Sequence, residues 1–195
     1  HISEISDLNN IYIGPSPGDG SLSVGGCYYS FYKFLKDKKD QNIKIKIKPI
    51  SNVYLGPEYT DSEIENCINS YNIKNFEVIK NYTTDDLVNY LVKDNVVARF
   101  SGRMELGQRS LGNRSIISSP INYSVVKKIN SKIKFRDFWM PFTPTILKEY
   151  EKKYIKNSKN LHSPFMTMAF DSTEEFIKIA PAAIHPADNT CRPQI

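Results

Sequence analysis

Short stretches of branched and aromatic residues recur along the chain and predict a series of β-strands. Isoleucine and lysine alternate strictly over 43–48, which is typical of an edge strand with one face in solvent. Turn-forming residues such as the Gly56-Pro57 pair separate the stretches from one another. The other predicted strands cover residues 10–14, 52–55, 76–80, 96–100, 116–118, 145–147 and 165–169.

Capping residues predict helices between these strands. Thr60 is followed three residues later by Glu63, the capping-box spacing, and begins a predicted helix of about ten residues. Ser21 caps a helix to about residue 34, in which Gly25 and Gly26 would allow close backbone packing. The remaining predicted helices run from Thr83 or Thr84 to Leu91, over 123–133, and from Thr173 to Ile179. The alternation of strands and helices favours the α/β class, with a domain boundary near residues 36–50.

Positive charge is concentrated in one part of the sequence. The chain has 26 lysines and arginines against 21 acids, and nine of these cations lie within 99–136, where Glu105 is the only acid. Such a concentration indicates an anionic ligand rather than a need for solubility. Five of the nine are arginines, whose planar guanidinium groups suit phosphate better than lysine does. Two alternatives are a solvated helix face, which would explain Lys127, Lys128 and Lys132, and a nucleic-acid groove.

The composition argues against several other classes of protein. No run of about 18 apolar residues is present, so we expect no transmembrane span, no signal peptide and a cytoplasmic protein. Cys27, Cys67 and Cys191 are too widely separated to suggest a disulfide framework or a zinc site, and we expect reduced thiols. Because His1 stands in place of an initiator Met, we expect a piece of a longer polypeptide.

Residues 102–115, with the sequence GRMELGQRSLGNRS, form the most informative segment. Arg103, Arg109 and Arg114 each stand beside a Gly or Ser, so guanidinium groups and exposed backbone N–H groups would share one loop. Such a loop can bind a phosphate and stabilise the charge that develops in phosphoryl or acyl transfer.

This segment resembles the signature of the O-carbamoyltransferases, enzymes that carbamoylate hydroxyl groups of antibiotics and nodulation factors. The family pattern is close to G-R-M-E-x-G-x-R-A-L-G-N-R-S-I, and Ser110 replaces the usual Ala. The resemblance continues over residues 52–195, with Asp137 where Glu is more usual. Its other blocks are 54–59 (YLGPEY), 129–130 (IN), 133–137 (IKFRD), 141–144 (PFTP), 163–166 (SPFM), and Asp188, Thr190, Arg192 and Gln194.

The resemblance implies a fold and a reaction. Residues 50–195 would form a YrdC-like α/β domain with an α+β tendency, a twisted mixed sheet with flanking helices. Residues 1–45 would be the end of an upstream metal- and nucleotide-binding domain, a short strand and helix of the actin/Hsp70-like ATPase type. In the family, carbamoyl phosphate releases phosphate, ATP is converted to carbamoyl adenylate and pyrophosphate, and a second domain passes the carbamoyl group to an acceptor hydroxyl.

The implied cofactors are ATP and Mg²⁺, with Fe²⁺ as a candidate in the complete protein and none expected on this piece alone. Asp19 resembles a metal ligand of the upstream domain whose other ligands precede this sequence, and a turn-capping role is an equal alternative. The implied partners are carbamoyl phosphate, ATP, a small-molecule acceptor and the missing N-terminal domain. A membrane and nucleic acid are not expected among them.

The candidate site residues follow from the charge pattern and the resemblance together. Arg109, Arg136 and Lys134 are assigned to catalysis, the last two through the K-x-R element of YrdC-like proteins. Surface ion pairs and a solvated helix end are the alternatives. The residues assigned to phosphate or substrate binding are Arg103, Arg114, Asn113, Ser115 and Arg192. Asn113 is equally a turn former, Arg192 is equally part of a structural ion pair, and Glu105 is a candidate to orient an arginine.

The favoured function is therefore the carbamoyl-adenylate-forming portion of an O-carbamoyltransferase, incomplete in this chain. Two other functions stay open. One is an RNA-binding YrdC-like module that uses the same basic segment, and the other is a non-catalytic fragment that requires its missing domain.

Overall fold

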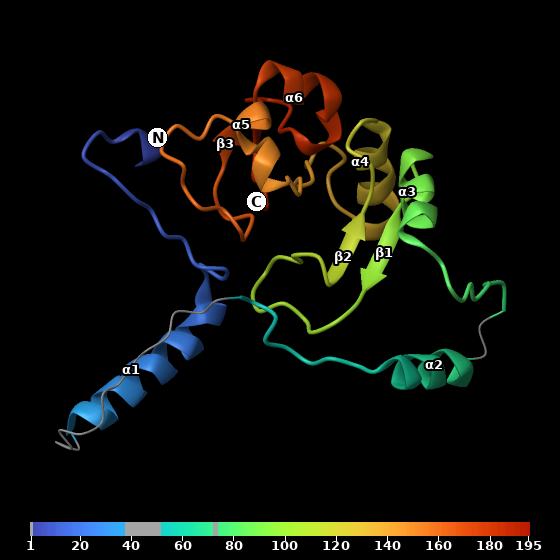
Figure 1. Cartoon of the computed structure of the whole chain (residues 1–195), viewed down its shortest axis with the longest axis horizontal. Helices are drawn as coiled ribbons and strands as arrows, with labels where there is room; N and C mark the ends of the chain where they lie inside the picture. The colour runs from blue at the N-terminus through green and yellow to red at the C-terminus, as the bar shows by residue number, and fades with distance from the viewer. Residues whose placement is uncertain (1, 38–51, 72–73) are drawn as a thin grey trace.

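The computed structural model describes residues 2–37, 52–71 and 74–195 as a mixture of helices and small sheets (Figure 1), so the expected α/β class is confirmed. The helices are α1 (Leu22–Asp37), α2 (Asp61–Ser70), α3 (Thr84–Val92), α4 (Ser124–Ile129), α5 (Glu151–Tyr154) and α6 (Glu174–Ile179). The strands are β1 (Val97–Phe100), β2 (Arg114–Ile117), β3 (Phe170–Asp171) and β4 (Thr190–Cys191). Short 3₁₀ turns cover Ile2–Glu4, Asp19–Ser21, Lys148–Tyr150 and Pro181–Ala183, and a π-helical turn covers Asn130–Lys134.

The strands form two small antiparallel sheets. β1 pairs with β2, with Val97 opposite Ile117, and β3 pairs with β4, with Phe170 opposite Cys191. The strands predicted over 96–100 and 116–118 are thereby confirmed. The strand predicted over 145–147 is reduced to one isolated parallel bridge between Thr145 and Gln194.

Three predicted strands are wrong. Residues 10–14, 52–55 and 76–80 have irregular backbone, because none of them forms a ladder with a neighbouring strand. Ile11 and Ile13 pack against the C-terminal core instead. The second segment lies against the loop that follows β1, where Leu106 N donates to Val53 O at 2.6 Å and Met104 N donates to Pro57 O at 2.9 Å.

Two further strand predictions differ from the structure in other ways. The strand predicted over 165–169 starts later, at Phe170, because Met166 has a left-handed backbone with φ 55° that a strand does not accommodate. The strand predicted over 43–48 lies outside the described residues, as does most of the predicted boundary at 36–50.

The capping box predicted in front of α2 is present, and Thr83, one of the two caps predicted for α3, also forms a capping box. Thr60 Oγ1 accepts from Glu63 N at 3.3 Å while the Glu63 carboxylate accepts from Thr60 N at 2.8 Å, and Thr83 with Asp86 repeats this pattern. The predicted helix over 123–133 is α4 with its π-helical extension, and α6 follows its Thr173 cap. Ser21 precedes α1 as expected but is not its cap, because its hydroxyl donates to Gly18 O.

Helix α1 extends away from the gathered elements α3–α6 (Figure 1), and none of its residues is buried. The prediction that Gly25 and Gly26 serve close packing is wrong within the described part of the chain. A Cβ added at either glycine would meet nothing within 4 Å.

The main apolar core lies in the C-terminal part of the chain and includes Phe170, Phe176 and Cys191. A smaller cluster of Val53, Leu111 and Met166 joins the loop after β1 to that part. No helix in the described ranges is long and apolar enough to cross a bilayer.

We predict that Cys27 and Cys67 react readily with a thiol reagent and that Cys191 does not. The first two are exposed, whereas burial in β4 shields Cys191 and raises its pKa to about 11, so little reactive thiolate forms. The measurement is thiol titration with a chromogenic disulfide at about pH 8. Cys191 should react only after denaturation, and equal rates at all three native cysteines would contradict its burial.

We predict that Gly107→Ala destabilises the protein. Gly107 has φ +108°, and a Cβ there would lie 2.8 Å from Pro15 O, so the free energy of unfolding should fall by about 1–3 kcal/mol in urea denaturation. The matched control is Gly25→Ala, where the space is open and helix propensity should add up to about 1 kcal/mol. Equal stabilities for the two variants would mean that the loop does not pack on residues 15–16.

Candidate functional site

The loop 101–113 between β1 and β2 is organised around one buried carboxylate. Glu105 is 7% exposed, and its Oε1 accepts hydrogen bonds from the backbone N–H groups of Leu111 (2.8 Å), Asn113 (2.7 Å) and Arg114 (3.3 Å). Burial alone would raise the pKa of Glu105, but these bonds outweigh it and lower the pKa below its usual value. The hypothesis that Glu105 orients an arginine side chain is therefore wrong, because its carboxylate accepts hydrogen bonds from backbone N–H groups.

Two of the predicted phosphate-binding arginines donate to the protein backbone. Arg103 Nε donates to Gly56 O at 3.0 Å, and its Nη2 donates to Leu55 O at 2.9 Å. Arg114 Nη1 donates to Ser101 O at 2.8 Å, while its guanidinium group lies 3.7 Å from the centre of the Phe100 ring. These contacts fix the ends of the loop.

Asn113 and Ser115, two more of the residues predicted for substrate binding, also contact residues of the loop. Asn113 Nδ2 donates to Arg103 O at 2.8 Å, across the loop. Ser115 Oγ accepts from Gly112 N at 2.9 Å. The Ser115 hydroxyl still has its own proton to donate, and this residue lines the pocket described below.

Arg109, Arg136 and Arg192 belong to three separate segments, and the first two lie near enough to Arg192 for their charges to act on it. Desolvation by the surrounding protein lowers the pKa of Arg192, and the positive charges of Arg109 and Arg136 lower it further. None of the three arginines forms an ion pair within the described residues. Arg192 is exposed and Arg109 and Arg136 are partly buried, so an anion from solvent can reach their positive charges.

The C-terminal segment explains how Arg192 reaches the loop. Gln194 Nε2 donates to Leu111 O at 3.1 Å, next to the segment that carries Arg109. The Gln194 backbone is fixed on its other side, because its N donates to Pro144 O and its O accepts from Ile146 N, both at 2.9 Å. One glutamine therefore ties the end of the chain to two other parts of the site.

Arg136 is held in place by one polar and one aromatic side chain, those of Asn130 and Phe142. Its Nε donates to Asn130 Oδ1 at 2.6 Å, and its guanidinium group lies 4.5 Å from the centre of the Phe142 ring. Burial lowers its pKa. Asn130 carried no predicted role, because a polar residue in a lysine-rich helical stretch is typical of a solvated face.

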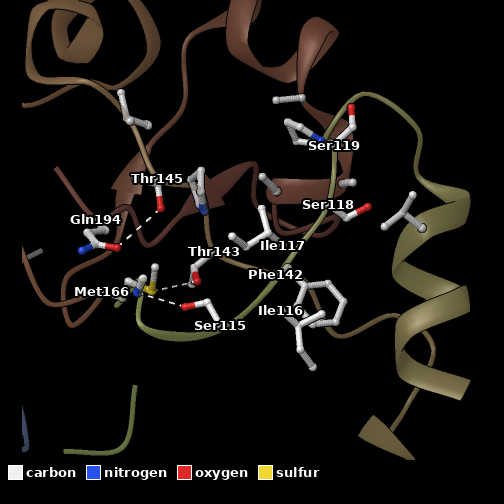
Figure 2. A pocket seen from close by; sticks show the side chains of 18 of the residues that line it. Ser115, Ile116, Ile117, Ser118, Ser119, Phe142, Thr143, Thr145, Met166 and Gln194 are labelled. Carbon is white, nitrogen blue, oxygen red and sulfur yellow. Dashed lines mark hydrogen bonds between the residues drawn. The ribbon is translucent and has the colours of Figure 1, made fainter. Parts of the chain in front are cut away.

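A pocket of about 890 Å³ is lined by Ser110, which follows Arg109, and by Phe142, which contacts Arg136; part of its lining is shown in Figure 2. Its walls come from β2, α4, α6 and residues 142–147 and are mostly apolar, with Ser115 and Lys134 among the polar lining groups. Phe142 and Gln194 border the pocket and also contact the arginine cluster or its loop. Figure 2 shows that the Thr143 and Thr145 hydroxyls at the pocket bond to Met166 and Gln194.

The predicted metal residue stands apart from any metal-binding group. Asp19 is exposed at the start of a 3₁₀ turn. Across the described ranges, no three His, Cys, Asp or Glu side chains are grouped so that they could hold a metal ion. The described residues therefore do not fit a resident iron site.

Comparisons with known proteins agree on a family. The family model described as the carbamoyltransferase C-terminus matches residues 88–195. The chain is 36% identical over 200 residues to the uncharacterized protein MJ1051 of Methanocaldococcus jannaschii, which covers 98% of the chain and 35% of that protein. It is 28% identical over 193 residues to the nodulation protein NolO of Bradyrhizobium diazoefficiens, with 96% of the chain and 33% of that protein covered. The chain thus spans about a third of the length of these relatives.

More than half of the chain lies within the matched region, and that region includes the loop, all three clustered arginines and the pocket-lining segments. The chain belongs to the carbamoyltransferase family, a family of transferases, and carries its C-terminal domain. The resemblance drawn from the GRMELGQRSLGNRS segment is confirmed at this level.

We predict that Glu105→Gln lowers the free energy of unfolding by about 1.5–3 kcal/mol near neutral pH, because three backbone donors lose a charged acceptor. The folded-state pKa is depressed below 4.5, so the stabilisation is complete above that pH and is lost as the pH falls through the folded value.

The difference between wild type and Glu105→Gln should therefore shrink on acidification, measured by urea denaturation from about pH 7 to about pH 3. The exposed Glu149→Gln is the control and should show no such difference. If the free energy of unfolding of Glu105→Gln stayed below that of the wild type by the same amount over this pH range, the charge of Glu105 would not support the loop.

Proposed function

We propose that this chain forms carbamoyl adenylate from ATP and the carbamate released from carbamoyl phosphate, for transfer to an acceptor hydroxyl by the rest of the protein. The observation that carries the proposal is the cluster of Arg109, Arg136 and Arg192 beside a largely apolar pocket. Membership of the carbamoyltransferase family supports the carbamoyl group as the unit transferred.

The chemistry requires charge stabilisation more than a proton acceptor. A carbamate oxygen attacks the α-phosphorus of ATP, and the bond from that phosphorus to the bridging oxygen breaks, so pyrophosphate leaves with the bonding electrons. Such transfers depend on positioning and on stabilising the charge of the leaving group. Arg109, Arg136 and Arg192 would bind the triphosphate and the departing pyrophosphate, with Lys134 at the pocket wall.

The pocket suits the nucleoside rather than the carbamoyl unit. Its volume of about 890 Å³ lies in the range of small-molecule sites and far exceeds a carbamate ion. Apolar walls beside a cationic cluster match a molecule with an apolar base and a polyanionic tail. Mg²⁺ would enter with the ATP oxygens, since the described residues hold no group of ligands for it.

The proposal includes the setting of the reaction. ATP and carbamoyl phosphate are cytoplasmic metabolites, so we place the reaction in the cytoplasm. The relatives are about three times longer than this chain, and we assign selection of the acceptor hydroxyl to the part that this chain does not contain. One curated relative is named nodulation protein NolO, and the resemblance of residues 102–115 to the O-carbamoyltransferase signature supports an acceptor hydroxyl.

We predict that Arg109→Gln and Arg136→Gln lower carbamoyl-adenylate formation by roughly 10²- to 10³-fold, the loss typical of removing one group that stabilises developing charge. The protein is incubated with ATP, Mg²⁺ and either carbamoyl phosphate or carbamate, and carbamoyl-AMP and pyrophosphate are measured by mass spectrometry and a coupled assay. Supplying carbamate removes the need for the first hydrolytic step.

The matched control is Lys127→Gln, which removes one positive charge from the exposed face of α4 and should retain activity. Wild-type rates in Arg109→Gln would contradict the proposed site. RNA binding with steep salt dependence, together with no product from the wild type, would favour the RNA-binding alternative.

A further inference from the structure

Asn130 is a completely buried polar residue at the point where α4 passes into the π-helical turn. Its Oδ1 accepts from Arg136 Nε at 2.6 Å. Its Nδ2 donates to Met140 O at 2.9 Å and to Phe138 O at 3.4 Å, and its backbone O accepts from Arg136 N at 3.2 Å. The side chain thus uses its acceptor for the arginine and its donors for the loop that follows.

The local backbone explains why Arg136 returns to Asn130. The π-helical turn ends at Lys134, and Phe135 adopts a left-handed backbone with φ 48° that reverses the direction of the chain. Arg136 is then placed between the Asn130 amide and the Phe142 ring, 4.5 Å from the ring centre, with Nη2 3.4 Å from Pro141 O. Within the described residues, Nη1 makes no hydrogen bond to the protein.

The choice of an amide has an electrostatic consequence. A buried arginine is usually held by a carboxylate, which would cancel its charge. Here a neutral amide oxygen and an aromatic ring fix the guanidinium group, so its positive charge stays uncompensated beside Arg192. We propose that Asn130 is a positioning residue that fixes the direction of Arg136 toward the bound polyphosphate without neutralising it. This inference rests on the anion site of the proposed function.

A merely structural role for Asn130 would work through different atoms. The Nδ2 bonds to residues 138 and 140 would stabilise the loop, and their loss would lower stability whether or not Arg136 is present. The positioning role works through Oδ1 and therefore requires Arg136. A double-mutant cycle between Asn130 and Arg136 separates the two roles.

The test measures the affinity of inorganic pyrophosphate by isothermal titration calorimetry for the whole chain. Asn130→Ala should weaken binding roughly tenfold when Arg136 is present, and by less than about twofold in the Arg136→Ala background. Asn157→Ala is the matched control, because Asn157 Nδ2 also donates to a backbone carbonyl, that of Leu161, at 2.9 Å, and its Oδ1 accepts from Leu161 N. This control should lose stability in urea denaturation and keep its pyrophosphate affinity.

Asn130→Asp provides a second measurement that keeps the Oδ1 acceptor and adds a negative charge. It should bind pyrophosphate at least about tenfold more weakly than the wild type, because the new carboxylate pairs with Arg136. Asn130→Asp removes the Nδ2 donors just as Asn130→Ala does, so the same measurement in the Arg136→Ala background separates the loss of those bonds from pairing with Arg136.

Equal weakening by Asn130→Ala in both backgrounds, or unchanged affinity in both Asn130 variants, would overturn the positioning role and leave the proposed function standing. Failure of the wild type to bind pyrophosphate would overturn the anion site itself, and with it this inference.

Discussion

The bond network of the Glu105 carboxylate determines the shape of the site. One buried oxygen accepts three backbone N–H groups from residues 111–114, so the loop after β1 is folded back on itself by a charge rather than by regular secondary structure. Charge-assisted bonds of this kind are stronger than neutral ones and are costly to leave unmade. The close approach of Gly107 to Pro15 depends on the same loop shape.

The arginines of the candidate site divide into those that brace this loop and those that do not. Arg103 and Arg114 bind backbone carbonyls and thereby build the loop. Arg109, Arg136 and Arg192 have no carboxylate partner in the described ranges, and the charges of the first two lower the pKa of Arg192.

Local signals in the sequence predicted the helices well and the strands poorly. Thr60 with Glu63 and Thr83 with Asp86 form capping boxes whose donors and acceptors lie within four residues, so nothing distant is needed to complete them. A strand requires a partner elsewhere in the chain, and 10–14, 52–55 and 76–80 have apolar residues of the right kind without one. Ile11 and Ile13 are partly buried through side-chain packing against the C-terminal core.

The sequence by itself determined the family, the excess of positive charge within 99–136 and the loop segment that carries it, because motif and composition are local properties. It could not distinguish Arg109 from Arg103, since both stand in the same type of turn. Only the tertiary structure decided which arginines converge, through the Gln194 bond to Leu111 and the Asn130 bond to Arg136. The first contact joins residues that are far apart in the sequence. The second depends on the left-handed backbone of Phe135, which reverses the chain direction. The geometry of both depends on the packing of the whole C-terminal region.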